Sequence, residues 1–175
     1  MQAARAFTEV EALDRGFERM KRQAKGFTLI ELVVTLSVIA ILAALALPRY
    51  IALQVQAREG KAQAIFGGIR SAAALAHAQA LTTNTTTNGA ATVFMEGQAV
   101  NLIHGYPTAD NLGILAALQL DPTNDQVTLS GGGAAAGSTL RIDINGGTAG
   151  QCSVIYTSPA APNTSPVFNI DVSQC

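Results

Sequence analysis

The hydrophobic and polar positions of the chain set one long apolar segment apart from a more mixed remainder. A run of 21 residues, 27–47, is apolar almost throughout and contains a single carboxylate, Glu31. At about 1.5 Å of rise per residue, a helix of this length measures roughly 31 Å, which matches the hydrocarbon core of a bilayer. The pattern therefore predicts a membrane-spanning helix. It also marks Glu31, because an acid inside such a span usually has a partner.

Beyond Pro48 the apolar residues recur with helical spacing and face charged residues such as Arg58 and Arg70. This spacing predicts an amphipathic helix over residues 48–81 that is half in water. Because proline removes one backbone hydrogen bond, we expect a kink at Pro48 rather than the end of the helix. The apolar positions are Ile51, Val55, Ile65, Ile69, Ala72, Ala73, Ala76 and Ala80.

Residues 82–175 carry short strand-like patterns separated by glycine-rich and proline-rich turns, which predict a small globular β-rich head. The run Thr82 to Thr87, which is threonine except for Asn84, and the following Asn88-Gly89 end the helix, and residues 113–119 fit one short helix. The expected fold class is α+β, with the long N-terminal helix packed on a small antiparallel sheet. The expected strands cover residues 91–95, 98–103, 127–129, 140–144, 152–157 and 167–172.

Charge is distributed unevenly about the apolar run. Residues 1–26 hold six Lys or Arg and four Asp or Glu, whereas residues 27–175 hold five Lys or Arg against eight Asp or Glu. The basic residues next to the span place residues 1–26 in the cytoplasm and the head outside by the positive-inside rule. The acidic balance of the remainder offers no basic surface, so we expect no nucleic-acid partner.

The residues around the start of the apolar run closely resemble the processing site of type IV prepilins and of the pseudopilins of type II secretion. The resemblance implies that a prepilin peptidase cuts between Gly26 and Phe27, that the same enzyme methylates the new amino group of Phe27, and that Glu31 is needed for assembly. It makes residues 1–26 a leader that is removed, with Met20 as an alternative translation start. The matching residues are Lys25-Gly26-Phe27-Thr28-Leu29-Ile30-Glu31.

The resemblance also implies partners and a location. A prepilin of this kind waits in the bacterial inner membrane with its head in the periplasm, and an assembly platform driven by an ATPase moves it into an extracellular homopolymer. Residues 27–47 then form the filament core, Pro48 sits where these proteins have a proline, and the filament serves attachment, aggregation or motility. Within the family, His77 and the segment 104–109 are most similar to pilins of the mannose-sensitive haemagglutinin (MSHA) type.

The two cysteines, Cys152 and Cys175, fit the late disulfide of many pilins, and an outward-facing head lies in an oxidising compartment. A metal or redox pair is the alternative, but the chain has no CxxC spacing, and neither His77 nor His104 has a neighbouring ligand at a suitable spacing. His77 is expected to pack under the sheet or to be exposed, and His104 to be a turn residue. We expect no metal, no cofactor and no catalytic residue.

Other interpretations of the same segment remain open at this point. An ordinary secretory signal peptide would be cut near Ala44-Leu45-Ala46, although its apolar region is usually shorter than this one. A simple membrane anchor would let Glu31 reach the interface. A pseudopilin of a type II secretion system shares every N-terminal motif, and a membrane-anchored binding protein that never polymerises is the remaining alternative.

Overall fold

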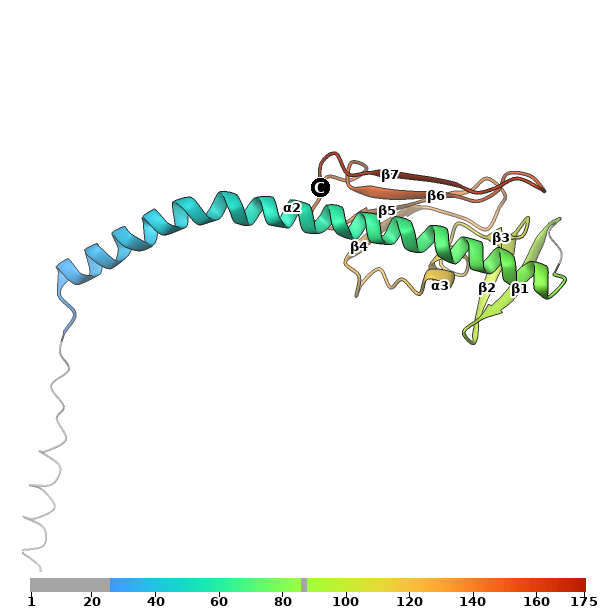
Figure 1. Cartoon of the computed structure of the whole chain (residues 1–175), viewed down its shortest axis with the longest axis horizontal. Coiled ribbons are helices and arrows are strands. Elements are labelled where there is room, and N and C mark those ends of the chain that lie inside the picture. Colours follow the sequence, from blue (N-terminus) through green and yellow to red (C-terminus); the bar gives the residue numbers. More distant parts are fainter. Residues whose placement is uncertain (1–25, 86–87) are drawn as a thin grey trace, which may run out of the picture. The chain divides into compact units, whose positions relative to one another are not determined.

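A computed structural model describes residues 26–85 and 88–175 of the chain (Figure 1). The chain divides into two compact units, Met1–Leu47 and Pro48–Cys175, and helix α2 (Leu29–Thr82) contributes residues to both. The proposed leader lies outside the described residues except for Gly26, and so does the alternative start at Met20.

In the first unit the structure describes residues 26–47, and most of them belong to the N-terminal part of α2. The helix begins at Leu29 rather than at Phe27, because Thr28 takes the N-cap position and its carbonyl oxygen accepts the first helical hydrogen bond, from Leu32. Every described residue from Gly26 to Leu47 is exposed within the unit. This part of α2 is long and apolar enough to cross a membrane, as judged by length and composition alone.

In the second unit, α2 buries a narrow stripe of mostly small residues. Alanines leave room for strands to approach the helix closely, and one larger side chain, Ile69, fills the centre of the stripe. Pro48 is the first residue of this unit and lies inside the helix, and the kink expected there stays a prediction. The buried residues of α2 are Ala62, Ile69, Ala72, Ala73, Ala76 and Ala80.

The strands of the second unit form two antiparallel sheets, whereas the sequence pattern predicted one. The three-stranded sheet has the order β1-β2-β3 and the four-stranded sheet the order β4-β5-β6-β7. The short helix α3 (Ile114–Leu118) follows the first sheet, as predicted. The strands are β1 (Ala90–Met95), β2 (Gln98–Ile103), β3 (Tyr106–Pro107), β4 (Val127–Gly131), β5 (Thr139–Ile144), β6 (Ser153–Thr157) and β7 (Val167–Asp171).

Two tight turns shape the three-stranded sheet. Glu96-Gly97 connects β1 to β2, as the pattern predicted, and His104-Gly105 connects β2 to β3. All four residues have positive φ, which two-residue hairpin turns of type I′ require and which glycine adopts without strain. His104 is therefore a turn residue, as expected. The strand β3 was missed, because two residues that include a proline carry no strand pattern.

Tyr156 belongs to the hydrophobic core under the four-stranded sheet and also bonds to the three-stranded sheet. Its side chain on β6 is fully buried, and its hydroxyl donates a hydrogen bond of 2.6 Å to the carbonyl oxygen of Pro107 on β3. The ring packs against Phe168 of β7 at a centroid distance of 5.6 Å. Tyr156 is thus a direct link between the four-stranded and the three-stranded sheet.

Candidate functional site

The first turn of α2 holds Glu31 in a reciprocal pair of hydrogen bonds with Thr28. The backbone N–H and the hydroxyl of Thr28 donate to Oε2 of Glu31 at 3.0 and 2.7 Å, and the N–H of Glu31 donates to the hydroxyl of Thr28 at 3.3 Å. This arrangement is a capping box, in which residues three apart satisfy each other's free polar groups at a helix start. Glu31 is therefore held at the start of the helix, with its Oε2 atom hydrogen-bonded to Thr28.

The other hydroxyl groups in this part of α2 are satisfied within the helix. The hydroxyl of Thr35 donates to the carbonyl oxygens of Glu31 and Leu32 at 2.8 and 2.9 Å, and that of Ser37 donates to the carbonyl oxygen of Val33 at 2.7 Å. Because these hydrogen bonds satisfy both hydroxyl groups within the helix, neither hydroxyl would be left without a partner in an apolar environment. Glu31 is the one residue in the predicted span that carries a charge.

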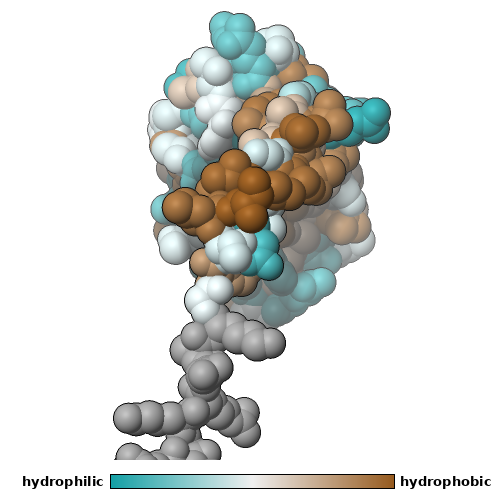
Figure 2. Space-filling view, turned by 90° about the vertical axis from the view of Figure 1, so that its left-hand side faces the viewer, coloured by the Kyte–Doolittle hydropathy of each residue, from teal (hydrophilic) through white to brown (hydrophobic). Residues whose placement is uncertain are grey.

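Apolar side chains of the same helical turns lie beside the exposed carboxylate. Figure 2 shows a broad hydrophobic area on the face that it displays, and the exposed large hydrophobic residues include Phe27, Leu29 and Ile30. A shallow hollow of about 350 Å³ lies along this turn of the helix. No Lys or Arg among the described residues forms an ion pair with Glu31. The hollow is lined by Phe27, Ile30, Glu31, Val34 and Thr35.

The proposed cleavage site lies just before the helix. Gly26, Phe27 and Thr28 have no regular secondary structure, and all three are exposed within this unit. A Cβ added to Gly26 would meet no atom within 4 Å. The Gly26–Phe27 peptide bond is therefore exposed among the described residues of this unit.

The two cysteines form the predicted disulfide. Cys152 and Cys175 are bonded to each other, both are buried, and they close a loop with a sequence separation of 23. The side chain of Arg58 on α2 donates a hydrogen bond to the carbonyl oxygen of Cys175. The disulfide thus ties the C-terminal residue to Cys152, directly before β6, and the Arg58 bond ties the same residue to α2.

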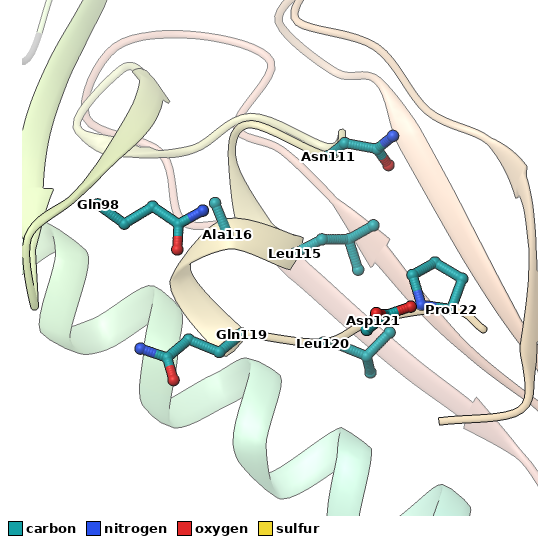
Figure 3. A pocket seen from close by; sticks show the side chains of 8 residues that line it. All are labelled: Gln98, Asn111, Leu115, Ala116, Gln119, Leu120, Asp121 and Pro122. Carbon is teal, nitrogen blue, oxygen red and sulfur yellow. The ribbon is translucent and has the colours of Figure 1, made fainter. Parts of the chain in front are cut away.

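A cavity of about 620 Å³ lies beside α3 in the second unit (Figure 3). Leu115, Leu120 and Pro122 gather toward one end of it, and the amides of Gln98 and Gln119 lie toward the other. The carboxylate that lines it, Asp121, accepts bonds from the backbone N–H groups of Thr123 and Asn124 and so shapes its own turn. The remaining lining residues are Asn111 and Ala116.

The described residues contain no group of three or more His, Cys, Asp or Glu side chains that could hold a metal ion. His77 is half-buried on α2, and its ring stacks on that of Tyr106 at 4.2 Å. It packs against the three-stranded sheet, which is one of the two environments expected for it.

Thr28 is a residue of the candidate site that the sequence analysis missed. Its role was signalled by the spacing Thr28-x-x-Glu31 directly before an apolar helical run, which is the sequence pattern of a capping box.

Two comparisons with known proteins found matches to the chain. Residues 21–47 match the family described as the prokaryotic N-terminal methylation motif. The chain is also similar to the type IV narrow pilus major component PilA5 of Thermus thermophilus, with 47% identity over 58 residues, which are 33% of this chain and 50% of the relative. No solved structure matches the chain. The chain therefore carries an N-terminal methylation motif and, over a third of its length, is similar to a type IV pilus component.

Proposed function

We propose that this chain is a structural subunit of a type IV pilus, processed between Gly26 and Phe27 and polymerised through the N-terminal part of α2. The observation that carries the proposal is the geometry of the first helical turn. A carboxylate is fixed at the start of an exposed apolar helix, four residues after the proposed new N-terminus. The matched methylation motif and the similarity to a pilus component support it.

Glu31 supplies the specific contact in this mechanism. Cleavage after Gly26 creates an amino group on Phe27, and methylation leaves that group able to carry a positive charge. In the membrane the carboxylate has only Thr28 as a partner within the described chain. In a filament it pairs with the Phe27 ammonium of an adjacent subunit, in a core of low dielectric where an ion pair is far stronger than in water.

The apolar surface supplies the remaining driving force. An exposed apolar helix is unstable in water, so it must lie in lipid or against other helices. Burying this surface against the same surface of neighbouring subunits offsets the loss of lipid contacts when a subunit leaves the bilayer. The partners are other copies of the chain, the prepilin peptidase that also methylates, and the platform and ATPase of pilus assembly.

The proposal extends to location and use. The head faces the periplasm before assembly and the medium afterwards, and the filament serves attachment, aggregation or motility. We also propose that the chain is most like pilins of the MSHA type, on the basis of His77 and residues 104–109. This similarity does not identify a ligand.

Replacement of Glu31 tests the proposal directly. Glu31→Ala should give a protein that is made, cut and held in the membrane at wild-type levels but is absent from filaments sheared off the cells. Ser37→Ala is the matched control. It removes a hydroxyl group from the same helix, and that hydroxyl bonds only to the Val33 carbonyl oxygen. Normal filaments from the Glu31 variant would refute the assembly role.

The same preparation separates the alternatives. Long extracellular filaments at native expression favour a pilin over a pseudopilin of a secretion system. A wild-type chain that keeps residues 1–26 and remains in the membrane would instead indicate an anchored binding protein.

A further inference from the structure

The turn that follows β5 contains an asparagine directly before a glycine, Asn145-Gly146, and both residues are exposed. At this dipeptide a protein chain loses a side-chain amide group most readily, because the glycine has no side chain to hinder its own nitrogen atom. The turn belongs to the second unit and takes no part in the assembly role proposed for the N-terminal part of α2.

The backbone nitrogen of Gly146 is not engaged in the turn. Gly147 donates its N–H to the carbonyl oxygen of Ile144 at 3.2 Å and so closes a turn with Asn145 and Gly146 at its centre. Among the described residues, none accepts a hydrogen bond from the N–H of Gly146. This nitrogen can therefore lose its proton and act as a nucleophile without the loss of a hydrogen bond.

A hydrogen bond polarises the side-chain amide of Asn145. The hydroxyl of Thr128 on β4 donates to Oδ1 of Asn145 at 2.8 Å. A nucleophile that attacks Cγ of Asn145 puts negative charge on this oxygen, and a donor already in place stabilises the charge as it forms. Thr128 thus makes Cγ of Asn145 easier to attack.

The guanidinium group of Arg58 on α2 lies close to the same turn. A Cβ built on Gly146 would be 3.1 Å from Nη1 of Arg58. Arg58 is half-buried, and its Nε donates to the carbonyl oxygen of Cys175, which holds the group in position. Because a nearby cation favours the ionised form of an acidic group, Arg58 promotes the loss of the proton from the Gly146 nitrogen.

The turn also permits the motion that a reaction between these atoms requires. The peptide unit between Asn145 and Gly146 must rotate to bring the nitrogen to Cγ. Gly146 has a φ of 87°, and Gly147 follows it, so two glycines in succession accommodate the backbone before and after the rotation. Since a single hydrogen bond between Gly147 and Ile144 closes the turn, the rotation needs only a local opening.

We propose that Asn145 is a modification site, at which the folded chain loses ammonia without an enzyme. The nitrogen of Gly146 loses its proton and bonds to Cγ of Asn145, the bond between Cγ and Nδ2 breaks, and ammonia leaves with that proton. A water molecule then opens the cyclic imide at either of its carbonyl groups. Opening at one carbonyl gives aspartate, and opening at the other gives isoaspartate, in which the main chain runs through Cβ.

The modification changes both the charge and the backbone of the turn. Either product places a carboxylate one residue before the glycine that Arg58 approaches. Isoaspartate also lengthens the main chain next to Gly147, which packs so tightly that an added Cβ would lie 2.5 Å from Cβ of Cys152. The second unit therefore acquires a negative charge and a strained turn beside its disulfide as the protein ages, whether or not the chain assembles into filaments.

Peptide mapping by mass spectrometry tests this proposal on the full chain, kept oxidised in detergent micelles in water enriched in heavy oxygen. The peptide that contains Asn145 should change in mass as an amino group is replaced by a heavy hydroxyl group, and electron-transfer fragmentation should detect isoaspartate in it. The rate should rise with pH, because the nitrogen must lose a proton. Asn124 and Asn163 are internal controls that should not change, since both are exposed in turns but precede Asp125 and Thr164.

Replacement of Thr128 tests the role of its hydroxyl. Thr128→Val removes the donor to Asn145 and keeps a β-branched side chain at an exposed strand position. The conversion of Asn145 should slow about fivefold, as expected for the loss of one hydrogen bond. Thr92→Val is the matched control, because the hydroxyl of Thr92 donates to Oδ1 of a different asparagine, Asn101, at 3.2 Å. This control should leave the rate unchanged.

Replacement of Arg58 tests the role of the cation. Arg58→Gln should slow the conversion about fivefold or more, because the nitrogen of Gly146 then loses its proton without a cation nearby. Arg70→Gln removes a cation elsewhere on α2 and should leave the rate unchanged. Circular dichroism establishes that each variant is folded before its rate is compared.

Three results would overturn the proposal. The first is an Asn145 that stays intact in the folded chain while it converts in the chain unfolded with urea and a reductant. The second is an equal rate in the wild type, the Thr128 variant and the Arg58 variant. The third is conversion to aspartate without any isoaspartate, since the amide would then be hydrolysed directly and not through a cyclic imide.

Discussion

Replacing Tyr156 by phenylalanine tests the link between the two sheets. The substitution keeps the buried ring and removes only the hydroxyl that donates to the carbonyl oxygen of Pro107 at 2.6 Å. Tyr156 and Pro107 are both fully buried, so water cannot replace the lost bond. The free energy of unfolding should fall by about 1–3 kcal/mol, the cost of leaving a buried acceptor without this partner. For a unit of this size, each kcal/mol corresponds to roughly 4 °C in Tm.

The assay is chemical and thermal unfolding of the full chain in detergent, followed by circular dichroism with the disulfide intact. Tyr50→Phe is the control, because Tyr50 is 60% exposed and lies on the helix away from the sheets. The control should unfold within about 0.5 kcal/mol of the wild type. Equal stability of the Tyr156 variant and the wild type would refute the claim that this hydrogen bond joins the sheets.

Alkaline pH gives a second measurement of the same residue. Burial raises the pKa of Tyr156 well above its usual value of 10.0. In the unfolded chain the phenol loses its proton above about pH 10, whereas the folded protein retains it, so the native state binds more protons there. The contribution of Tyr156 to stability is complete below pH 10 and is lost above it by about 1.4 kcal/mol per pH unit. The Phe variant should lack this component of the pH dependence.

The remaining predictions concern the disulfide, one glycine and the helix cap. Replacing both Cys152 and Cys175 by alanine should lower the free energy of unfolding by about 3 kcal/mol, measured by denaturant titration against the oxidised wild type. Gly147→Ala should lower the free energy of unfolding by about 1–3 kcal/mol, because the new Cβ would lie 2.5 Å from Cβ of Cys152. Gly60→Ala is the control, because its new Cβ would meet nothing within 4 Å, and it should stabilise the helix. Thr28→Val should speed amide hydrogen exchange in the first helical turn, whereas Thr28→Ser should not; equal protection in both variants would contradict the capping role.

The long helix and the first hairpin were predictable because their signals are local. The apolar periodicity over residues 48–81 specifies a helix over the same residues. The turn residues Glu96-Gly97 specify the hairpin that contains them. The division into two sheets was not predictable in the same way. It depends on which strands pair over long range and on a two-residue strand, Tyr106–Pro107, that carries no alternation of its own.

The candidate sites show the same contrast. Glu31 stood out because an acid in an apolar run is costly, and Cys152 and Cys175 because the chain has no other cysteine. The stack of His77 on Tyr106 could not be found from the sequence, since the two residues lie on distant segments and only the fold brings them together. The Tyr156–Pro107 bond joins residues 49 positions apart and has no local signal either.

The most direct test of the pilin proposal is the mass of the protein sheared from the surface of cells that express it, measured on the intact chain and on its N-terminal peptide. We predict a chain that starts at Phe27, carries one extra methyl group on its amino terminus and is two hydrogens lighter than its reduced form. A chain that starts near Leu47 would contradict the account, because it would indicate a secreted protein released by a signal peptidase. An uncut chain found only in membranes would contradict it as well.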